Sequence, residues 1–462
     1  MSKNKPSLKK ELGLKDLILF NIACVIGLSS LTQAAQFGWS SILLWLVAAI
    51  CFLLPIALVV IELGKRVGGM GGFYAWTKSA LGSKHAFIAA WSYWMSNLVW
   101  FPTVLFTIVY SSYFIYSDSV PEQNDSILPT IIALLVLWFI VLLNIYGLKF
   151  AKWIQNVGAI ALWLLLILIT VSAFVYINKH EITTPTIKML MPDLSDFRIL
   201  PFFAAICFSF GGLELSSVMY AEIKNPAKNL TRSVLYSSFF ILIFYIFLTL
   251  ILIVTNPDGN LDIVYGIAQT FHKIDLAISW PFLGSIGALL VTLSTVGLFS
   301  SWLTGSARLP FAIGLDNYLP SFLGKVHSKY KSPYWSLIVQ AIIISILFIL
   351  SKLGSQIQEA YSVLYDMSVI LYFIPFLYIF ISFIIHLKKN TSGISAFRFF
   401  EKLNSTAWIC AVLGFTVIFL SIILALLPSN TIVNKGLFYI KTIGGSIAFI
   451  GIGLLFYYRK TI

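Results

Sequence analysis

Twelve long apolar runs follow one another along the chain, and this pattern constrains its fold more than any other feature of the sequence. A helix that crosses the hydrocarbon core of a bilayer needs roughly 20 consecutive, mainly apolar residues. Only 11% of the residues are charged, whereas soluble domains carry about 25%, so the chain is not a soluble protein. We therefore predict an all-α polytopic membrane protein with 12 transmembrane helices, at residues 16–37, 40–62, 85–116, 128–147, 153–177, 199–221, 233–255, 281–306, 333–352, 360–386, 406–427 and 436–458.

The distribution of basic residues predicts the orientation of these helices. An even number of crossings places both termini on one side, and the segments on that side hold 24 of the 31 Lys and Arg residues. Because short cytosolic loops are enriched in Lys and Arg, we expect both termini in the cytosol and the protein in a plasma or bacterial inner membrane. The opposite loops carry acids instead, for example Asp118, Glu122 and Asp125. The net charge of +13 thus reflects topology, and no nucleic acid partner is expected.

Small residues interrupt two of the runs at mid-membrane depth, in residues 25–30 (VIGLSS) and 208–214 (FSFGGLE). These are spans 1 and 6, which are equivalent first helices if the chain consists of two inverted five-span repeats. Unwound backbone is tolerated there only where it lines a cavity or binds a ligand. Free N–H groups suit a carboxylate and free carbonyls an ammonium group, so the breaks predict a site for a zwitterionic amino acid. Close helix packing through small residues is the alternative.

The spans then group into one membrane domain. We expect a cytosolic N-terminal tail over 1–15, a first five-span repeat over 16–177, a second, inverted repeat over 199–386, two peripheral spans over 406–458 and a cytosolic C-terminus over 459–462. All four cysteines lie inside apolar runs, so no disulfide framework is expected.

Two acidic residues lie well inside the predicted spans, where charges are costly and a functional role is the default expectation. Glu214 follows the break in span 6, where a carboxyl group that responds to the state of the cavity would act as a proton-linked or pH-sensing switch. A neutral carboxyl group bonded to a neighbouring helix is the alternative. Asp366 in span 10 either selects cationic substrates or simply reaches the outer vestibule.

Other polar and aromatic side chains within the spans are candidates for ligand contact. Asn97 in span 3 either binds substrate or joins two helices. Trp302 in span 8 stands among small residues, where it closes over a ligand or fills a helix interface. The neighbouring Ser300 and Ser301 suggest a sodium-binding pair, although serine is common in membrane helices. No other metal site and no cofactor are expected.

Motifs beside these residues resemble the amino acid, polyamine and organocation transporter superfamily over nearly the whole chain. The most specific match is residues 208–214 followed by 221–226 (AEIKNP), which look like the sixth-span and loop signature of that family. Glu62 with residues 71–76 (GGFYAW), and residues 305–310 (GSARLP) after span 8, support the resemblance. Trp302 and the segment Trp100–Thr103 look most similar to the bacterial antiporters that exchange glutamate for GABA or arginine for agmatine.

The resemblance implies the leucine-transporter type of fold, a five-plus-five inverted repeat in which helices 1 and 6 are broken. The substrate-binding residues that it implies, together with the breaks, are Ile26, Gly27, Leu28, Ser29, Asn97, Phe208, Ser209, Phe210, Gly211 and Trp302. The family's Gly-Ser-Gly carboxylate site falls on residues 27–29, where only the first glycine is kept. Its gating aromatic residue falls on Phe208 and its pH-responsive glutamate on Glu214.

The sequence thus predicts a secondary active transporter that works by alternating access and exchanges an amino acid for another amino acid or an amine. Some proton-coupled relatives carry a lysine in span 5, and residues 155–162 hold none, which favours exchange. Proton-coupled symport of an amino acid or polyamine, and sensing without transport, stay open. Two mid-span acids cannot form the charged ring of a channel, and no catalytic motif indicates an enzyme. The expected partners are a small amino acid or amine and the lipid bilayer, and a homodimer is an alternative to a monomer.

Overall fold

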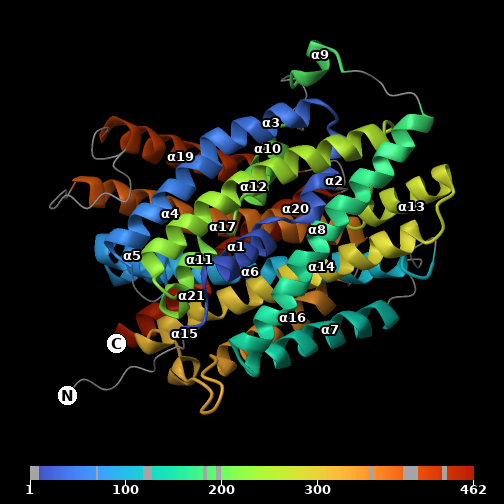
Figure 1. The fold of residues 1–462 in the computed structure, drawn as a ribbon. Helices are drawn as coiled ribbons and strands as arrows, with labels where there is room; N and C mark the ends of the chain where they lie inside the picture. Colours follow the sequence, from blue (N-terminus) through green and yellow to red (C-terminus); the bar gives the residue numbers. More distant parts are fainter. Residues whose placement is uncertain are drawn as a thin grey trace.

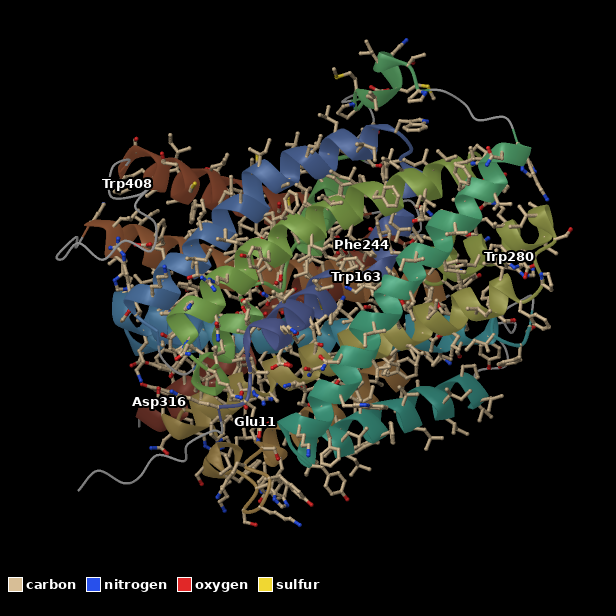
Figure 2. All side chains as sticks on the ribbon, viewed as in Figure 1. Glu11, Trp163, Phe244, Trp280, Asp316 and Trp408 are labelled. Atoms are coloured by element: carbon tan, nitrogen blue, oxygen red, sulfur yellow. The ribbon has the colours of Figure 1, made fainter. Side chains whose placement is uncertain are left out.

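The computed structural model describes residues 10–68, 71–117, 127–180, 185–193, 199–352, 357–388, 404–428 and 434–461. Over these residues the chain is helical, and Figure 1 shows a bundle of long helices with both termini at the same end. Figure 2 shows Glu11 and Asp316 near that end and Trp280 at the opposite end. Asp118, Glu122 and Asp125, and residues 1–9 of the expected tail, lie outside the described residues.

The first half of the bundle begins with two helices that share one span. Its helices are α1 (Leu14–Val25), α2 (Leu28–Gln36), α3 (Ser40–Ala48), a π-helical turn η1 (Ala49–Leu53), α4 (Leu54–Arg66), α5 (Phe73–Leu81), α6 (Ser83–Tyr113), α7 (Ile127–Ile145), α8 (Leu148–Lys179) and α9 (Ile187–Leu190).

The second half also begins with a divided span. Its helices are α10 (Ile199–Ser209), α11 (Leu215–Val218), η2 (Tyr220–Glu222), α12 (Pro226–Thr255), α13 (Gly266–Ile278), α14 (Leu283–Ser306), α15 (Arg308–Leu315), η3 (Ser321–Gly324), α16 (Tyr334–Ser351), α17 (Ile357–Lys388), α19 (Asn404–Leu424), α20 (Lys435–Tyr439), η4 (Ile440–Gly444) and α21 (Gly445–Thr461).

These helices form twelve membrane crossings, as predicted. Within the described residues, nine helices are long and apolar enough to cross a membrane, and the bent pair of α1 and α2 makes a tenth. The eleventh is α6, which has 31 residues and tolerates more polar side chains because most of it is buried. The broken sixth span, α10 with α11, completes the set.

Burial separates the inner helices from those that face lipid. In the spans formed by α14 and by α17, 61% and 67% of the most apolar stretch is buried, against 33% in α7 and α8. Large apolar side chains such as Leu135 and Phe139 therefore point outward from α7. In the last span, only 22% of the most apolar stretch is buried. Figure 1 shows α7 and α19 on opposite flanks of the bundle with α1 between them.

Several short helices were not predicted, among them α5, α13 and α15. They have 9, 13 and 8 residues and connect successive spans. A search for runs of roughly 20 apolar residues detects only segments that cross the bilayer, so it does not detect helices that are shorter than a span.

Candidate functional site

A cavity of about 50 Å³ lies where both broken spans meet α6, α14 and α17. Of the ten residues predicted to bind substrate, eight line it: Gly27, Leu28, Ser29, Asn97, Phe208, Ser209, Gly211 and Trp302. The other two side chains do not. Ile26 is buried beside the break in span 1, and the Phe210 ring packs on Trp45 and Tyr245.

The break in span 1 is a two-residue interruption. The α1 helix ends at Val25, Ile26 and Gly27 are extended, and α2 starts at Leu28 after a bend of 44°. The first N–H groups of a helix have no partner inside it. The start of α2 therefore presents backbone donors and the positive end of a helix dipole beside the cavity.

The break in span 6 depends on two glycines. The α10 helix ends at Ser209, and Gly212 has φ of +121°, a conformation that strains other residues. A Cβ atom on Gly211 would overlap the hydroxyl group of Tyr372. The FSFGGLE segment is thus a turn that brings its backbone against α17, and the Phe208 ring lies edge-on to Tyr365 and Tyr372 at centroid distances of 5.2 and 5.0 Å.

Glu214 lies behind the cavity rather than in its wall. It is fully buried, and its Oε1 accepts hydrogen bonds from the hydroxyl groups of Tyr93 and Tyr372, each at 2.6 Å. The N–H of Gly212 donates to Oε2 at 3.0 Å. Because Tyr372 also lines the cavity, one hydroxyl group connects Glu214 with the space that a ligand would occupy.

Trp302 closes the cavity on the α14 side. Its indole Nε1 donates to the carbonyl oxygen of Cys24 at 2.6 Å, one residue before α1 ends. Its ring lies 5.2 Å from that of Trp100 and 6.0 Å from that of Tyr372. The side chain is 5% exposed. Trp302 thus lines the cavity and also joins α14 to the first break, and its closing over a ligand stays a prediction.

Two buried polar atoms in the cavity wall lack a hydrogen-bond partner among the described residues. The Nδ2 group of Asn97 donates to the carbonyl of Tyr93 at 2.7 Å, which leaves its Oδ1 unpaired. The hydroxyl group of Tyr365 is also unpaired. Both residues line the cavity. Buried polar groups are normally satisfied, so these two atoms are suited to a ligand.

Tyr245 of α12 was not singled out from the sequence, although it connects the two breaks. Its hydroxyl oxygen lies 2.7 Å from the carbonyl of Val25 and 3.0 Å from that of Ser209, and it accepts the N–H of Gly27 at 3.0 Å. The sequence feature that could have identified it is a tyrosine inside an apolar span, because the buried hydroxyl group of such a residue needs a hydrogen-bond partner. Tyr93, Tyr365 and Tyr372 were missed for the same reason.

The positions of Asp366 and of the pair Ser300 and Ser301 differ from those of the residues in the cavity wall. Asp366 lies on α17 but is not among the residues that line the cavity. The hydroxyl group of Ser301 donates to the carbonyl of Gly297 in its own helix, and that of Ser300 accepts from Asn144. The serine hydroxyls are thus engaged in contacts within and between helices.

The end of the bundle that carries the termini is held by two sequence motifs that pair. Arg308 from GSARLP and Glu222 from AEIKNP form a bidentate ion pair, with both N–O distances at 2.9 Å and both side chains about 5% exposed or less. The N–H groups of Glu11 and Leu12 donate to the carbonyl of Glu222. The N-terminal segment thereby covers the loop that follows the broken sixth span.

Comparison with known proteins identifies the family. The model of the family described as "Amino acid permease" matches residues 12–449. The chain belongs to the amino acid permease family. It is an integral membrane protein of the amino acid, polyamine and organocation superfamily, and the family consists of transporters rather than enzymes. The family predicted from the motifs is therefore confirmed.

Individual relatives agree with this assignment. An uncharacterized transporter of Legionella pneumophila is 30% identical over 364 residues, which cover 78% of this chain and 77% of that protein. A probable agmatine/putrescine antiporter of Lactococcus lactis is 24% identical over 378 residues, which cover 81% of this chain and 79% of that protein. A glutamate/gamma-aminobutyrate antiporter of the same species is 24% identical over 359 residues, which cover 75% of this chain and 70% of that protein.

The fold has a solved counterpart. The crystal structure of MhsT in complex with L-phenylalanine superposes with a TM-score of 0.65 at 15% sequence identity, over 90% of this chain and 99% of that one. The likeness concerns the fold alone, and it confirms the leucine-transporter type with broken helices 1 and 6.

Proposed function

We propose that the protein is a secondary active transporter that carries an amino acid by alternating access and exchanges it for another amino acid or an amine. One observation carries the proposal: the broken helices of both repeats meet around one cavity. Unwound backbone inside a membrane is tolerated where it lines such a cavity. A ligand drives a conformational cycle only if it binds the two states with different affinity, and the breaks are where those affinities would differ.

The two breaks suit the two charged ends of an amino acid. The start of α2, at Leu28 and Ser29, supports carboxylate binding through backbone N–H groups, whereas the N–H of Gly27 already donates to Tyr245. The carbonyl groups at the end of α10 and in the turn that follows suit the ammonium group. In this arrangement Ile26 and Phe210 contribute through their backbone, because their side chains point away from the cavity. Trp302 and Phe208 then cover the ligand.

Packing between α8 and α14 supports exchange over lysine-dependent symport. A Cβ atom on Gly158 of α8 would lie 2.5 Å from the Cα atom of Gly297 of α14. Such a distance is not tolerated, so position 158 in span 5 has no room for a lysine side chain. The two antiporters of Lactococcus lactis described above are consistent with exchange.

Proton-coupled symport is the second candidate because of Glu214. This carboxyl group is fully buried, and its three hydrogen-bond donors are neutral. A buried carboxyl group without a cationic partner is costly when charged, which makes it a natural place for a proton that travels with the substrate. Under either mechanism we propose that the end of the bundle with the termini faces the cytosol, as the positive-inside bias indicates.

Uptake into liposomes separates these possibilities. The purified protein is reconstituted, the liposomes are loaded with one unlabelled amino acid or amine, and uptake of the labelled compound is measured at acidic and neutral pH. We expect uptake only when an internal partner is present. Uptake driven by a pH gradient without an internal partner would mean symport, and binding without uptake under both conditions would mean a sensor.

A further inference from the structure

The walls of the central cavity carry no formal charge. Among the residues described, those that line it include no Asp, Glu, Lys, Arg or His. The two mid-span acids are not exceptions, because Glu214 lies behind Tyr372 and Asp366 is not part of the wall. An anionic side chain of a ligand would therefore lose its hydration without gaining a counter-charge, which is costly in the interior of a membrane protein. A cationic side chain would gain only the faces of aromatic rings, which attract a cation more weakly than a carboxylate does.

The zwitterionic part of an amino acid does not face this cost. Its carboxylate and ammonium groups meet the ends of half-helices, each equivalent to roughly half an elementary charge of the opposite sign. The remaining wall offers hydroxyl groups, aromatic rings and the unpaired atoms Asn97 Oδ1 and Tyr365 Oη. These atoms form hydrogen bonds to neutral polar groups as readily as to charged ones.

The size of the cavity adds a second restriction. Its volume of about 50 Å³ accommodates only a few water molecules, since each needs about 10–15 Å³ by the same measure. The rings of Trp302, Trp100 and Phe208 bound this space. A ligand the size of alanine or serine replaces that water without displacing a ring, whereas a long side chain requires the wall to move.

We infer that the substrate is a small zwitterionic amino acid with an uncharged side chain, and that agmatine, putrescine, arginine and glutamate are poor substrates. This inference rests on the proposed function and narrows it. It also separates this chain from the Lactococcus lactis relatives named for agmatine/putrescine and for glutamate/gamma-aminobutyrate.

The test compares neutral and charged compounds in one assay. Liposomes that contain the protein are loaded in turn with serine, alanine, arginine, glutamate, agmatine or putrescine, and uptake of the same labelled compound is measured. In parallel, binding of each compound is followed by quenching of tryptophan fluorescence, because Trp100 and Trp302 line the cavity. We expect serine or alanine to exceed every charged compound at least about tenfold in both assays.

The outcomes distinguish this inference from the proposed function. Comparable uptake or binding of a charged compound overturns the inference while leaving transport intact. Selective binding of serine or alanine without uptake supports the inference and rejects transport. If none of these compounds binds, the inference is rejected, whereas the proposed function still allows a larger neutral amino acid as substrate.

A designed charge provides an independent test. Thr295 lines the cavity from α14, and among the described residues its hydroxyl group donates to the carbonyl of Val291 in the same helix. Thr295→Asp adds a carboxylate to the wall, and Thr295→Asn is the matched neutral control. We expect Thr295→Asp alone to raise the ratio of agmatine to serine binding at least about tenfold. An unchanged ratio in a correctly folded variant would contradict the inference.

Asp366→Asn supplies the opposite control. If Asp366 lies outside the cavity wall, removing its charge changes uptake of neutral and cationic compounds by the same factor. A selective loss of cationic compounds would show that Asp366 faces the substrate and would overturn the inference.

Discussion

Single side chains at the cavity combine ligand contact with contacts between helices, and Trp302 is the clearest example. Its ring covers the cavity, while its indole N–H donates to the end of α1. A substitution there changes ligand contact and helix contact together, so the two roles have to be separated by graded substitutions.

Two substitutions of Trp302 separate its contact with the ligand from its contact with α1. Trp302→Phe keeps an aromatic cover but loses the bond to Cys24, worth about 0.5–1.5 kcal/mol, so substrate affinity should fall up to about tenfold. Trp302→Ala removes the cover and should weaken binding much further, and the loss of a large buried ring should also lower the stability of the fold by about 3–5 kcal/mol. Affinity is measured by equilibrium binding of labelled substrate. The control is Trp163→Phe on the lipid-facing surface of α8, where Trp163 is 39% exposed (Figure 2). Unchanged affinity of Trp302→Ala would reject the covering role.

Glu214 is the residue to test for coupling to protons. Glu214→Gln preserves the size of the side chain and an acceptor for Tyr93 and Tyr372, but it cannot exchange a proton. If Glu214 is proton-linked, transport by this variant should lose most of its pH dependence between acidic and neutral pH. Initial uptake rates at several pH values provide the measurement. A pH profile like that of the unmodified protein would remove Glu214 from the coupling mechanism.

Broken helices work as transport elements only if their halves are held together, and Tyr245 provides this connection. Its one hydroxyl proton is shared between two carbonyl oxygens, on α1 and α10, while Gly27 donates to it from the start of α2. The hydroxyl group therefore joins three helix ends. The two breaks, one from each repeat, are tied to a single point on α12.

We expect Tyr245→Phe to slow transport by at least about tenfold, because it leaves a buried N–H group and two carbonyl groups without this partner at a cost of about 1–3 kcal/mol each. Substrate affinity should change less than the rate, since Tyr245 does not line the cavity. Tyr236→Phe is the matched control, on the same helix but 59% exposed. Equal rates for both variants would show that the connection is dispensable.

In the whole molecule, the end with the termini is held together by contacts between distant motifs. Arg308 and Glu222 form a buried ion pair, and the N-terminal segment lies along the same loop. Removal of one partner from a buried ion pair costs about 3–5 kcal/mol. The pair should therefore favour the state that is closed at this end.

Glu222→Gln tests this role. We expect the closed state to be destabilised, so that a cysteine introduced at the cavity residue Ser96 reacts faster with a membrane-impermeant thiol reagent applied from the side that carries the termini. Cys24 also lines the cavity and is replaced by serine in every variant of this assay. Asp258→Asn is the control, because Asp258 is 53% exposed in its pair with Lys273 and exposed pairs contribute about 0–1 kcal/mol. Equal reaction rates in the two variants would contradict a gating role for Glu222.

The sequence by itself determined the number of spans, their approximate ends, the two breaks and the family. These features are local, because the need for an apolar run and the weakness of Gly- and Ser-rich turns depend on neighbouring residues along the chain. Residues 208–214 illustrate this: their glycines indicated a break, and the turn lies there.

Only the tertiary structure decided which side chains face the cavity and which support it. Tyr93 and Tyr372 are 121 and 158 residues from Glu214 in sequence, and Tyr245 is 220 residues from Val25. No local pattern links such positions, because the contacts depend on how the helices rotate and cross when they pack. The same packing keeps Ile26 and Phe210 out of the cavity wall and, among the residues that the structure describes, places no charged side chain in it.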